Sequence, residues 1–387
     1  MTYHRFETAT PEEVGISSAN IRKFVEVLEE NELQTHNILL LRHGKLIFEQ
    51  YWAPFHREHK HRMYSVTKSF VSLAIGFLEQ EGRISLDDPI CKYFPAESEN
   101  AHPFRKAQTI RHMLMMATSY GSNYWFGDRP EDRVQNYFSF RPEGIHPAGT
   151  VWSYDSSGSF ILGALVERVT GMKLFHYLKD RLFDKIGVGE VDWLDCPGGH
   201  TWSDSALLAR PIDLLRVALF CMNKGEGILN EAYVTAATAK QFDTHTGGHC
   251  LYESQGYGYQ FWRSVDNSFF FNGMGGQFAV CVPDKDLIMV INADNQGITD
   301  ATSVVLEHFF NLISRPAGEP LPPAETPLCP DGMELHHTKG EKHTSLESKV
   351  SGAVYRLDEN PMGMTELSVT FGEDEGVLRW VNAQGEK

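Results

Sequence analysis

The chain has 387 residues, with 51 acidic side chains against 35 Lys and Arg side chains and a formal net charge of −16. Hydrophobic residues make up 42% and charged residues 22%, a globular composition that excludes a disordered chain. The acidic balance argues against nucleic acid or an anionic membrane as the main partner, because both require a basic surface. The length predicts either two or three domains or a single large one.

Two further features bear on location and redox state. No stretch approaches the roughly 20 apolar residues that a membrane helix needs, and residues 1–10 lack the apolar core of a secretory signal. The six cysteines lie far apart without a Cys-x-x-Cys pair, which predicts reduced, packed thiols rather than a zinc or redox site. We therefore expect a cytoplasmic protein that does not bind membranes.

The N-terminal part of the chain predicts a helix, a hairpin and a second helix. Apolar residues spaced for one buried face predict a helix over 17–33. Two apolar runs, 37–42 and 46–52, predict strands joined by a turn at Gly44. Helical spacing resumes over 69–81, and the long middle of the chain is predicted to be mostly helical, with helices over 110–116, 160–169, 174–183 and 212–223.

Strand character returns late in the chain, before a closing helix over 302–313. Short apolar runs separated by turn residues predict strands over 258–262, 268–271, 277–282 and 287–292. This order predicts one α/β (α+β) domain over 1–315. Its antiparallel sheet would be built from both chain ends and would carry an all-helical subdomain at about 84–250.

The composition changes after this domain. Six prolines between 316 and 330 predict a linker over 316–332. Apolar runs at 350–357 and 367–371 then predict strands of a small β-rich C-terminal segment over 333–387. So few strand residues are marginally stable alone, which suggests a longer module or packing on the main domain.

The clearest chemical signal is Ser65-Val-Thr-Lys68 at the start of the second predicted helix. A serine hydroxyl is a weak nucleophile unless a nearby base takes its proton. One helical turn separates the two residues, so Lys68 folds back toward Ser65 and, partly removed from water, can serve as that base. The helix N-terminus also supplies N–H groups for a developing oxyanion. Ser-x-x-Lys also occurs by chance, but this is the only copy in the chain and it heads an apolar helix.

Ser65-x-x-Lys68 and the run that ends in Asp87-Asp-Pro-Ile90 resemble the serine beta-lactamase-related family. That family includes class C beta-lactamases, DD-peptidases, esterases and 6-aminohexanoate-dimer hydrolases. The other stretches that resemble it are 109–119, 147–171, 257–262 and 273–277. The resemblance spans roughly 10–315 in the right order and implies a beta-lactamase/transpeptidase-like fold.

The resemblance implies roles for three residues. Ser65 would be the acylated nucleophile and Lys68 its base. Tyr154 matches the family's second-motif tyrosine, which shares the proton with the lysine and protonates the leaving group. Outside that family context, Tyr154 would be read as a buried aromatic residue before a helix.

The second motif departs from the family pattern in a way that concerns substrate binding. Tyr154-Asp155-Ser156 stands where many members have Tyr-x-Asn. Ser156 offers one hydroxyl in place of the paired donor and acceptor of an amide. Asp155 and Ser156 are therefore candidate substrate-binding residues of altered chemistry.

The third motif also departs from the pattern. Phe271-Asn-Gly-Met-Gly-Gly276 stands where beta-lactamases have Lys-Thr-Gly, so the cation expected to hold a beta-lactam or peptide carboxylate is missing. Such a contact is worth about 1.5–3 kcal/mol. Gly273, Met274 and Gly275 still suit an oxyanion hole, with Met274 the expected backbone donor. The Gly-x-x-Gly-Gln pattern over 273–277 resembles that of the 6-aminohexanoate-dimer hydrolase and esterase branches more than that of true beta-lactamases.

Other candidates have simpler explanations. His56, His59 and His61 precede Ser65 and could hold a metal, but their segment is highly charged and has no matching carboxylates, so a solvated loop is expected. Further histidines are expected in loops, and four tryptophans fall in segments expected near the cleft, where core packing is the default explanation. The histidines are His245, His249, His336 and His337, and the tryptophans are Trp125, Trp152, Trp202 and Trp262.

The sequence therefore predicts a serine hydrolase that cleaves an ester or amide bond through a covalent acyl-enzyme. We expect a small-molecule or peptide-like substrate and neither a metal nor an organic cofactor. Two alternatives stay open. One is a penicillin-binding DD-carboxypeptidase or weak beta-lactamase, which the missing lysine disfavours. The other is a non-catalytic ligand-binding or sensor protein on the same fold, which the intact Ser65, Lys68 and Tyr154 disfavour.

Overall fold

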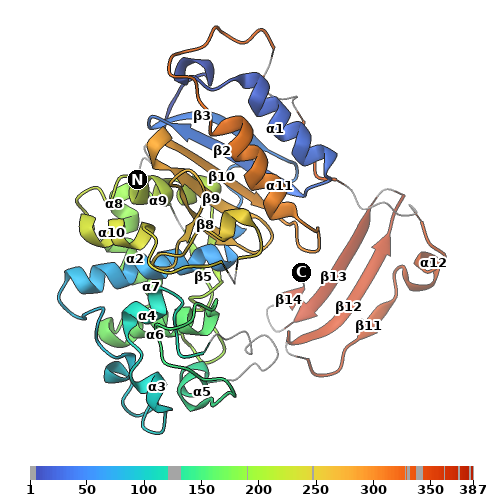
Figure 1. The fold of residues 1–387 in the computed structure, drawn as a ribbon. Coiled ribbons are helices and arrows are strands. Elements are labelled where there is room, and N and C mark those ends of the chain that lie inside the picture. The colour runs from blue at the N-terminus through green and yellow to red at the C-terminus, as the bar shows by residue number, and fades with distance from the viewer. Residues whose placement is uncertain are drawn as a thin grey trace. The chain divides into compact units, whose positions relative to one another are not determined.

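The computed structural model describes residues 6–120, 132–189, 191–245, 248–326, 328, 332–336, 343–360, 362–373, 375–382 and 385–386. The chain divides into two compact units, Met1–His336 and His337–Lys387. Figure 1 shows the larger unit as a sheet with helices around it and the smaller unit as a short sheet of its own.

The larger unit is built around a seven-stranded sheet in the order β1-β3-β2-β10-β9-β8-β7. The strands are β1 (Glu7–Thr8), β2 (Thr35–Arg42), β3 (Lys45–Tyr51), β7 (Trp262–Arg263), β8 (Phe269–Gly273), β9 (Gln277–Val282) and β10 (Leu287–Ala293). Because β10 pairs antiparallel with β2, strands from both ends of the unit meet at the centre of the sheet. This confirms the predicted sheet; β1 departs from it by pairing parallel with β3.

Helices make up most of the central part of the chain (Figure 1). They are α1 (Ser18–Glu30), α2 (Thr67–Gln80), α3 (Pro103–Lys106), α4 (Ile110–Leu114), α5 (Arg133–Ser139), α6 (Ser156–Thr170), α7 (Leu174–Leu178), α8 (Asp184–Ile186), α9 (Pro211–Met222), α10 (Glu231–Thr238) and α11 (Ala301–His308). The π-helical turns Lys179–Phe183 and Phe309–Ile313 continue α7 and α11. Among the described residues, no helix combines the length and the apolar character needed to cross a bilayer.

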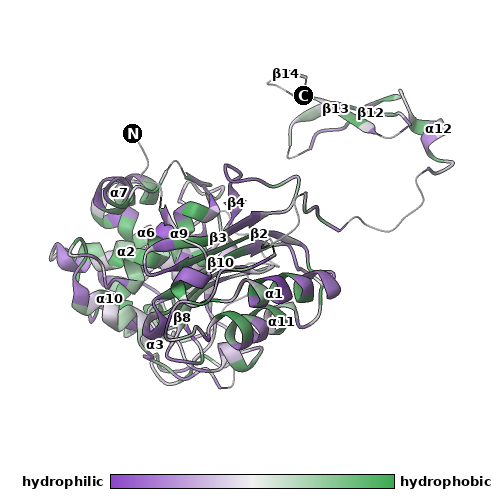
Figure 2. Ribbon diagram, turned by 90° about the horizontal axis from the view of Figure 1, so that it is seen from above, coloured by the Kyte–Doolittle hydropathy of each residue, from purple (hydrophilic) through white to green (hydrophobic). Residues whose placement is uncertain are grey.

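Both faces of the large sheet are buried, because successive side chains of a strand point to opposite faces and are apolar on both. In β2, Ile38 and Leu40 belong to the hydrophobic cluster that includes residues of α1 and α11. Leu39 and Leu41 belong to the cluster that includes residues of α2 and α9. Figure 2 shows the central strands as mainly apolar ribbon. The sheet is therefore the middle layer between two sets of helices.

The predicted subdomain is mostly helical but not all-helical. It contains β5 (Asp192–Trp193) and β6 (Leu207–Ala209), which form a three-stranded sheet with β4 (His61–Arg62) in the order β4-β6-β5. The short apolar run of β6 pairs with the segment just before Ser65, and this long-range pairing leaves no periodic signal in the sequence.

Of the strand predicted over 258–262, only Trp262 lies in a strand, as the first residue of β7 (Trp262–Arg263). Gln260 has a φ of +64°, which interrupts an extended chain. Its side-chain amide donates to the carbonyl oxygens of Met113 (3.0 Å) and Leu114 (2.9 Å) and accepts from the hydroxyl of Ser159 (2.6 Å). This segment therefore bridges α4 and α6 instead of extending the sheet.

The Pro-rich segment predicted as a linker is hydrogen-bonded, near its start, to the N-terminal part of the larger unit. Backbone N–H groups of Ala317 and Leu321 donate to the carbonyl oxygens of Gly15 (2.8 Å) and Glu12 (2.9 Å). The smaller unit begins after His336, four residues beyond the predicted end of the linker.

The smaller unit is a four-stranded sheet in the order β11-β12-β13-β14, with one short helix. Its elements are α12 (Glu347–Val350), β11 (Val354–Arg356), β12 (Met364–Phe371), β13 (Gly376–Asn382) and β14 (Gly385–Glu386). The two predicted strands correspond to β11 and β12, whereas β13 and β14 were not predicted.

Candidate active site

Ser65 and Lys68 lie where a 3₁₀ turn, Tyr64–Val66, runs into α2 at Thr67. Ser65 thus stands just before the helix that it was predicted to open. The Nζ atom of Lys68 lies 2.9 Å from Oγ of Ser65 and 2.7 Å from the carbonyl oxygen of Asp204. The Lys68 side chain is only 1% exposed, so its amine is almost withdrawn from water.

The residue directly before Ser65 has an unusual backbone conformation. Tyr64 has a φ of +44°, in the left-handed region that strains a non-glycine residue. Two contacts hold its side chain: the Gln296 amide donates to its hydroxyl (3.2 Å), and the Arg62 guanidinium lies 4.6 Å from its ring centre. Strain of this kind persists only where surrounding contacts enforce it, and it is typical of functional sites.

Tyr154 approaches the pair from the segment before α6. Lys68 Nζ lies 5.1 Å from the centre of the Tyr154 ring. The ring stacks on Trp262 at 5.7 Å, with an interplanar angle of 22°, and meets Tyr257 edge-on at 6.5 Å. The structure therefore brings together the three residues that the family resemblance singled out. Tyr154 lies 86 positions after Lys68 in the chain.

A cavity of about 610 Å³ opens at Ser65. Its walls combine aromatic rings, glycine backbone and a few polar groups, as is usual for small-molecule sites. The lining residues are Ser65, Trp152, Ser153, Tyr154, Ser156, His249, Glu253, Trp262, Asn272, Gly273, Met274, Gly275 and Thr302.

The predicted oxyanion segment forms the turn between β8 and β9 and borders this cavity. Gly275 has a φ of +82°, a conformation that favours glycine. The Gln277 amide nitrogen holds the turn by donating to the carbonyl oxygens of Met274 (3.2 Å) and Ala293 (2.5 Å). Gly273 and Met274 thus lie on a backbone that is fixed beside Ser65.

The two candidates that follow Tyr154 face different surroundings. Asp155 is 1% exposed and is the N-terminal cap of α6. Its carboxylate accepts hydrogen bonds from the backbone of Gly158 (2.9 Å) and the hydroxyls of Ser157 (2.5 Å) and Thr118 (2.7 Å). Ser156, in contrast, lines the cavity. Asp155 is therefore engaged in holding α6, and Ser156 is the residue of the two that lines the cavity.

Several polar residues of the cavity wall were not predicted as site residues, among them Asn272, Glu253 and His249. The Asn272 amide donates to Glu253 Oε1 (2.6 Å), and the backbone N–H of His249 donates to Glu253 Oε2 (3.1 Å). The Glu253 side chain is 5% exposed. His249 and Glu253 belong to one loop segment and Asn272 to β8, and no motif links the segment to the strand, so the sequence offers no signal that they meet.

Burial shapes the electrostatics beside the lysine. Asp204 is 4% exposed, and burial raises the pKa of its carboxyl group, while the positive charges of Lys68 and Arg133 oppose that rise. Burial also raises the pKa of Tyr257 well above its ordinary value, so this neighbour of Tyr154 stays a neutral phenol.

His61 does not lie in the solvated loop that its sequence context predicted. It belongs to β4 and is 5% exposed, and its Nδ1 lies 3.3 Å from Nδ1 of His36. Phe55 stacks on His36 at 3.8 Å. Burial lowers the pKa of His36 to about 4 and that of His61 to about 3, so both rings are neutral at pH 7. In the part of the chain that the structure describes, no cluster of three or more His, Cys, Asp or Glu residues could hold a metal ion.

The tryptophans expected near the cleft divide into three groups. Trp152 and Trp262 line the cavity. Trp202 packs instead against the guanidinium of Arg133, 4.7 Å from its ring centre. Trp125 lies outside the described residues.

The sheet built from both chain ends, together with the Ser65, Lys68 and Tyr154 constellation, defines a class of hydrolases. The chain belongs to the Beta-lactamase family, whose model matches residues 20–303. The predicted family and the predicted fold class are thereby confirmed.

Individual relatives are distant. The 6-aminohexanoate-dimer hydrolase of Paenarthrobacter ureafaciens is 24% identical over 317 residues, which cover 74% of this chain and 80% of that protein. Esterase EstB of Burkholderia gladioli is 27% identical over 179 residues, 39% of this chain and 45% of that protein. The structure of the octameric penicillin-binding protein homologue from Pyrococcus abyssi has a TM-score of 0.63 at 16% identity and covers 96% of this chain and 90% of that one.

Proposed function

We propose that this protein is a serine hydrolase that cleaves an ester or amide bond through an acyl-enzyme at Ser65. The observation that carries the proposal is the 2.9 Å contact between Lys68 Nζ and Ser65 Oγ, made by a lysine that is almost fully buried. At this distance the Lys68 amine is in place to accept the proton of the serine hydroxyl as Ser65 attacks.

The acylation step uses all three residues. Ser65 Oγ attacks the carbonyl carbon while its proton passes to Lys68, and the carbonyl oxygen becomes an oxyanion. We assign the oxyanion to the backbone N–H groups of Ser65 and Met274, whose segments border the same cavity. The C–O or C–N bond of the substrate then breaks, and Tyr154, next to Lys68, supplies the proton that the departing alcohol or amine takes up.

Water completes the reaction. It adds to the carbonyl carbon of the acyl-enzyme as Lys68 and Tyr154 take one of its protons. Collapse of this second tetrahedral intermediate breaks the bond to Ser65 Oγ, which recovers a proton, and the acid is released.

The cavity wall supports a substrate without a carboxylate at the binding position. Among the described residues that line the cavity, none is Lys or Arg, and Glu253 adds a carboxylate. Trp152 and Trp262 supply apolar contact area. These features favour neutral esters or amides over beta-lactams and peptides with a free C-terminus, and an esterase is among the relatives.

The test compares wild type with Ser65→Ala, and with Ser139→Ala on the exposed end of α5 as a matched control. Three readouts are needed: turnover of a short-chain p-nitrophenyl ester, turnover of nitrocefin, and intact mass after treatment with a phosphonate probe. We expect ester turnover and a single adduct in wild type and in Ser139→Ala, and neither in Ser65→Ala.

Other outcomes point elsewhere. An adduct that persists in Ser65→Ala would exclude Ser65 as the nucleophile. Rapid nitrocefin turnover would favour the penicillin-recognising alternative. An adduct at Ser65 with no turnover of esters or of an amide panel would favour a binding or sensor protein.

A further inference from the structure

The buried carboxylate of Glu253 lies at the wall of the cavity that Ser65 borders. Its Oε1 atom accepts from the Asn272 amide (2.6 Å), and its Oε2 atom accepts from the backbone N–H of His249 (3.1 Å). Both donor residues line the cavity as well, so the carboxylate is held among residues of the cavity wall. A carboxylate can accept about four hydrogen bonds, so these two leave about two lone-pair positions for a bound molecule.

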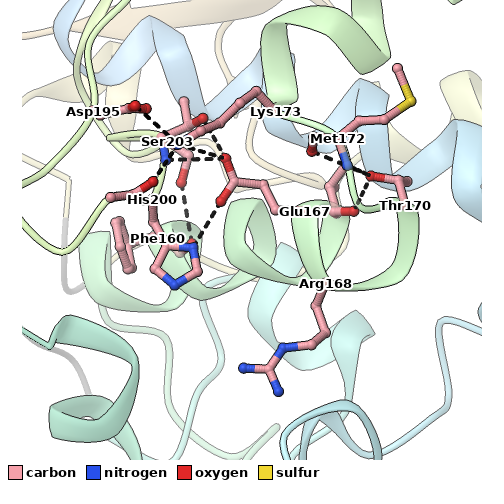
Figure 3. A network of polar contacts seen from close by, with 12 residues as sticks. Phe160, Glu167, Arg168, Thr170, Met172, Lys173, Asp195, His200 and Ser203 are labelled. Atoms are coloured by element: carbon pink, nitrogen blue, oxygen red, sulfur yellow. Dashed lines mark hydrogen bonds and ion pairs between the residues drawn. The ribbon is translucent and has the colours of Figure 1, made fainter.

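Figure 3 shows a carboxylate with different partners, that of Glu167 near the end of α6. It accepts hydrogen bonds from the backbone (3.1 Å) and the hydroxyl (2.5 Å) of Thr201, and His200 Nδ1 lies 2.8 Å from it. Lys173 Nζ lies 4.0 Å from the same carboxylate. A cation of the protein itself thus balances the charge of Glu167.

The Glu253 carboxylate has no such cation beside it. Its two partners are neutral groups, and no ion pair joins it to a Lys, Arg or His side chain of the described residues. Among the described residues that line the cavity, only His249 could carry a positive charge, and its contact with Glu253 is through the backbone. A buried charge is costly without an opposite charge, so a bound molecule that supplies one would be favoured.

The aromatic part of the cavity wall suits the same kind of molecule. The ring centres of Trp152 and Trp262 lie 5.5 Å apart, and Tyr154 stacks on Trp262. The faces of such rings attract a cation, and their apolar area packs against the alkyl groups that surround an ammonium nitrogen. The carboxylate and the aromatic rings therefore favour the same ligand chemistry.

We propose that the substrate of this site carries an ammonium group, which binds in the cavity beside the Glu253 carboxylate. The inference rests on the proposed function and narrows its substrate class. The ester or amide bond that Ser65 attacks is itself neutral, and the positive charge lies elsewhere in the same molecule. Glu253 is then a residue that determines specificity, and Asn272 holds its carboxylate in place.

The experiment compares esters that carry an ammonium group with uncharged esters of the same shape. On the acyl side, the pair is methyl 4-(dimethylamino)butanoate and methyl 5-methylhexanoate. On the alcohol side, it is 2-(dimethylamino)ethyl butanoate and 3-methylbutyl butanoate. The tertiary amines are protonated at neutral pH and cannot form a lactam. For each pair, the ratio of kcat/KM for the charged ester to kcat/KM for the uncharged ester is measured in wild type and in Glu253→Gln. Glu307→Gln is the matched control, because it removes the same charge from an exposed position of α11 outside the cavity lining.

We expect Glu253→Gln to lower this ratio by about 10- to 100-fold for at least one pair, the size of a hydrogen bond to a charged group. Glu307→Gln should keep the wild-type ratio. The comparison between variants cancels the intrinsic reactivity of the esters, because each protein meets the same two molecules. An unchanged ratio for both pairs in Glu253→Gln, or an equal fall in Glu307→Gln, would overturn the proposal.

If Glu253→Gln does not fold, wild type still decides. Its ratio is then compared with the ratio for hydroxide-catalysed hydrolysis of the same esters, and a preference no greater than that of hydroxide for both pairs contradicts the proposal. Absence of turnover and of labelling in wild type would instead count against the proposed function. Titrations followed by the fluorescence of Trp152 and Trp262 would then test the inference by binding alone. Tighter binding of the charged ester of at least one pair supports it, and equal binding within both pairs overturns it.

Discussion

Replacing Gly273 by alanine tests whether β8 and the Ser65 turn must approach as closely as the structure has them. A Cβ atom at Gly273 would lie 2.4 Å from the carbonyl oxygen of Met63, whereas ordinary contact begins at 3.4 Å. The backbone must therefore open by about 1 Å, and a misplacement of that size near reacting groups costs about 100-fold in rate. The Met63 carbonyl also accepts the N–H of Val66 (3.1 Å), so the displacement reaches the turn that carries Ser65.

The assay is ester hydrolysis with a thermal unfolding curve on the same samples. We expect kcat/KM to fall by about 100-fold and stability to fall by about 1–3 kcal/mol, the usual cost of forcing extra volume into a packed site. Gly318→Ala is the control, because a Cβ atom there meets nothing within 4 Å. Wild-type activity and stability in Gly273→Ala would refute the close approach and the oxyanion assignment built on it.

Three other expectations follow from the site and its surroundings. Tyr154→Phe should lower the rate of hydrolysis of an amide or alkyl ester by about 10²–10⁴-fold. Hydrolysis of a p-nitrophenyl ester should fall by much less, because that leaving group departs without a proton. Equal losses in parallel assays would exclude Tyr154 as the acid. Gln277→Leu should lower stability to urea by about 1–3 kcal/mol, because the buried Ala293 carbonyl loses its 2.5 Å donor. His36 and His61 have pKa values lowered by burial to about 4 and about 3, below the ordinary 6.5, so the unfolded chain binds protons that the native state does not. Stability should therefore be full above pH 6.5 and fall as the pH drops toward 4, and thermal midpoints of a His36→Gln/His61→Gln variant should fall less over that window than those of wild type.

Features with local causes could be predicted from the sequence. Ser65 and Lys68 are three positions apart, so their contact needs only the turn that an apolar helix start provides. Strands β2, β3, β8, β9 and β10 of the large sheet could be found because their apolar runs are bounded by turn residues, as at Gly44, whose φ is +70°. The prediction of a strand over 258–262 was wrong because its conformation has a non-local cause. Gln260 is held by hydrogen bonds to residues of α4 and α6, and no local sequence pattern indicates these contacts.

Family resemblance supplied what local pattern could not. Tyr154 lies beside Lys68 because α6 packs against α2, and its own sequence context reads as ordinary core. The sequence likewise gave no means to tell Asp155 from Ser156, since only the cap of α6 shows which of them turns away from the cavity.

The sequence by itself determined the family and the apolar runs that form the large sheet, and it singled out Ser65 and Lys68 as the candidate nucleophile and base, because each of these depends on local spacing or on a motif. Only the tertiary structure decided which residues form the cavity wall and which residues lie next to Lys68. Glu253, Asn272 and Asp204 reach the site through contacts between segments far apart in the chain. Such contacts are set by how helices and strands pack in three dimensions, and packing leaves no periodic trace in any one of the segments that it joins.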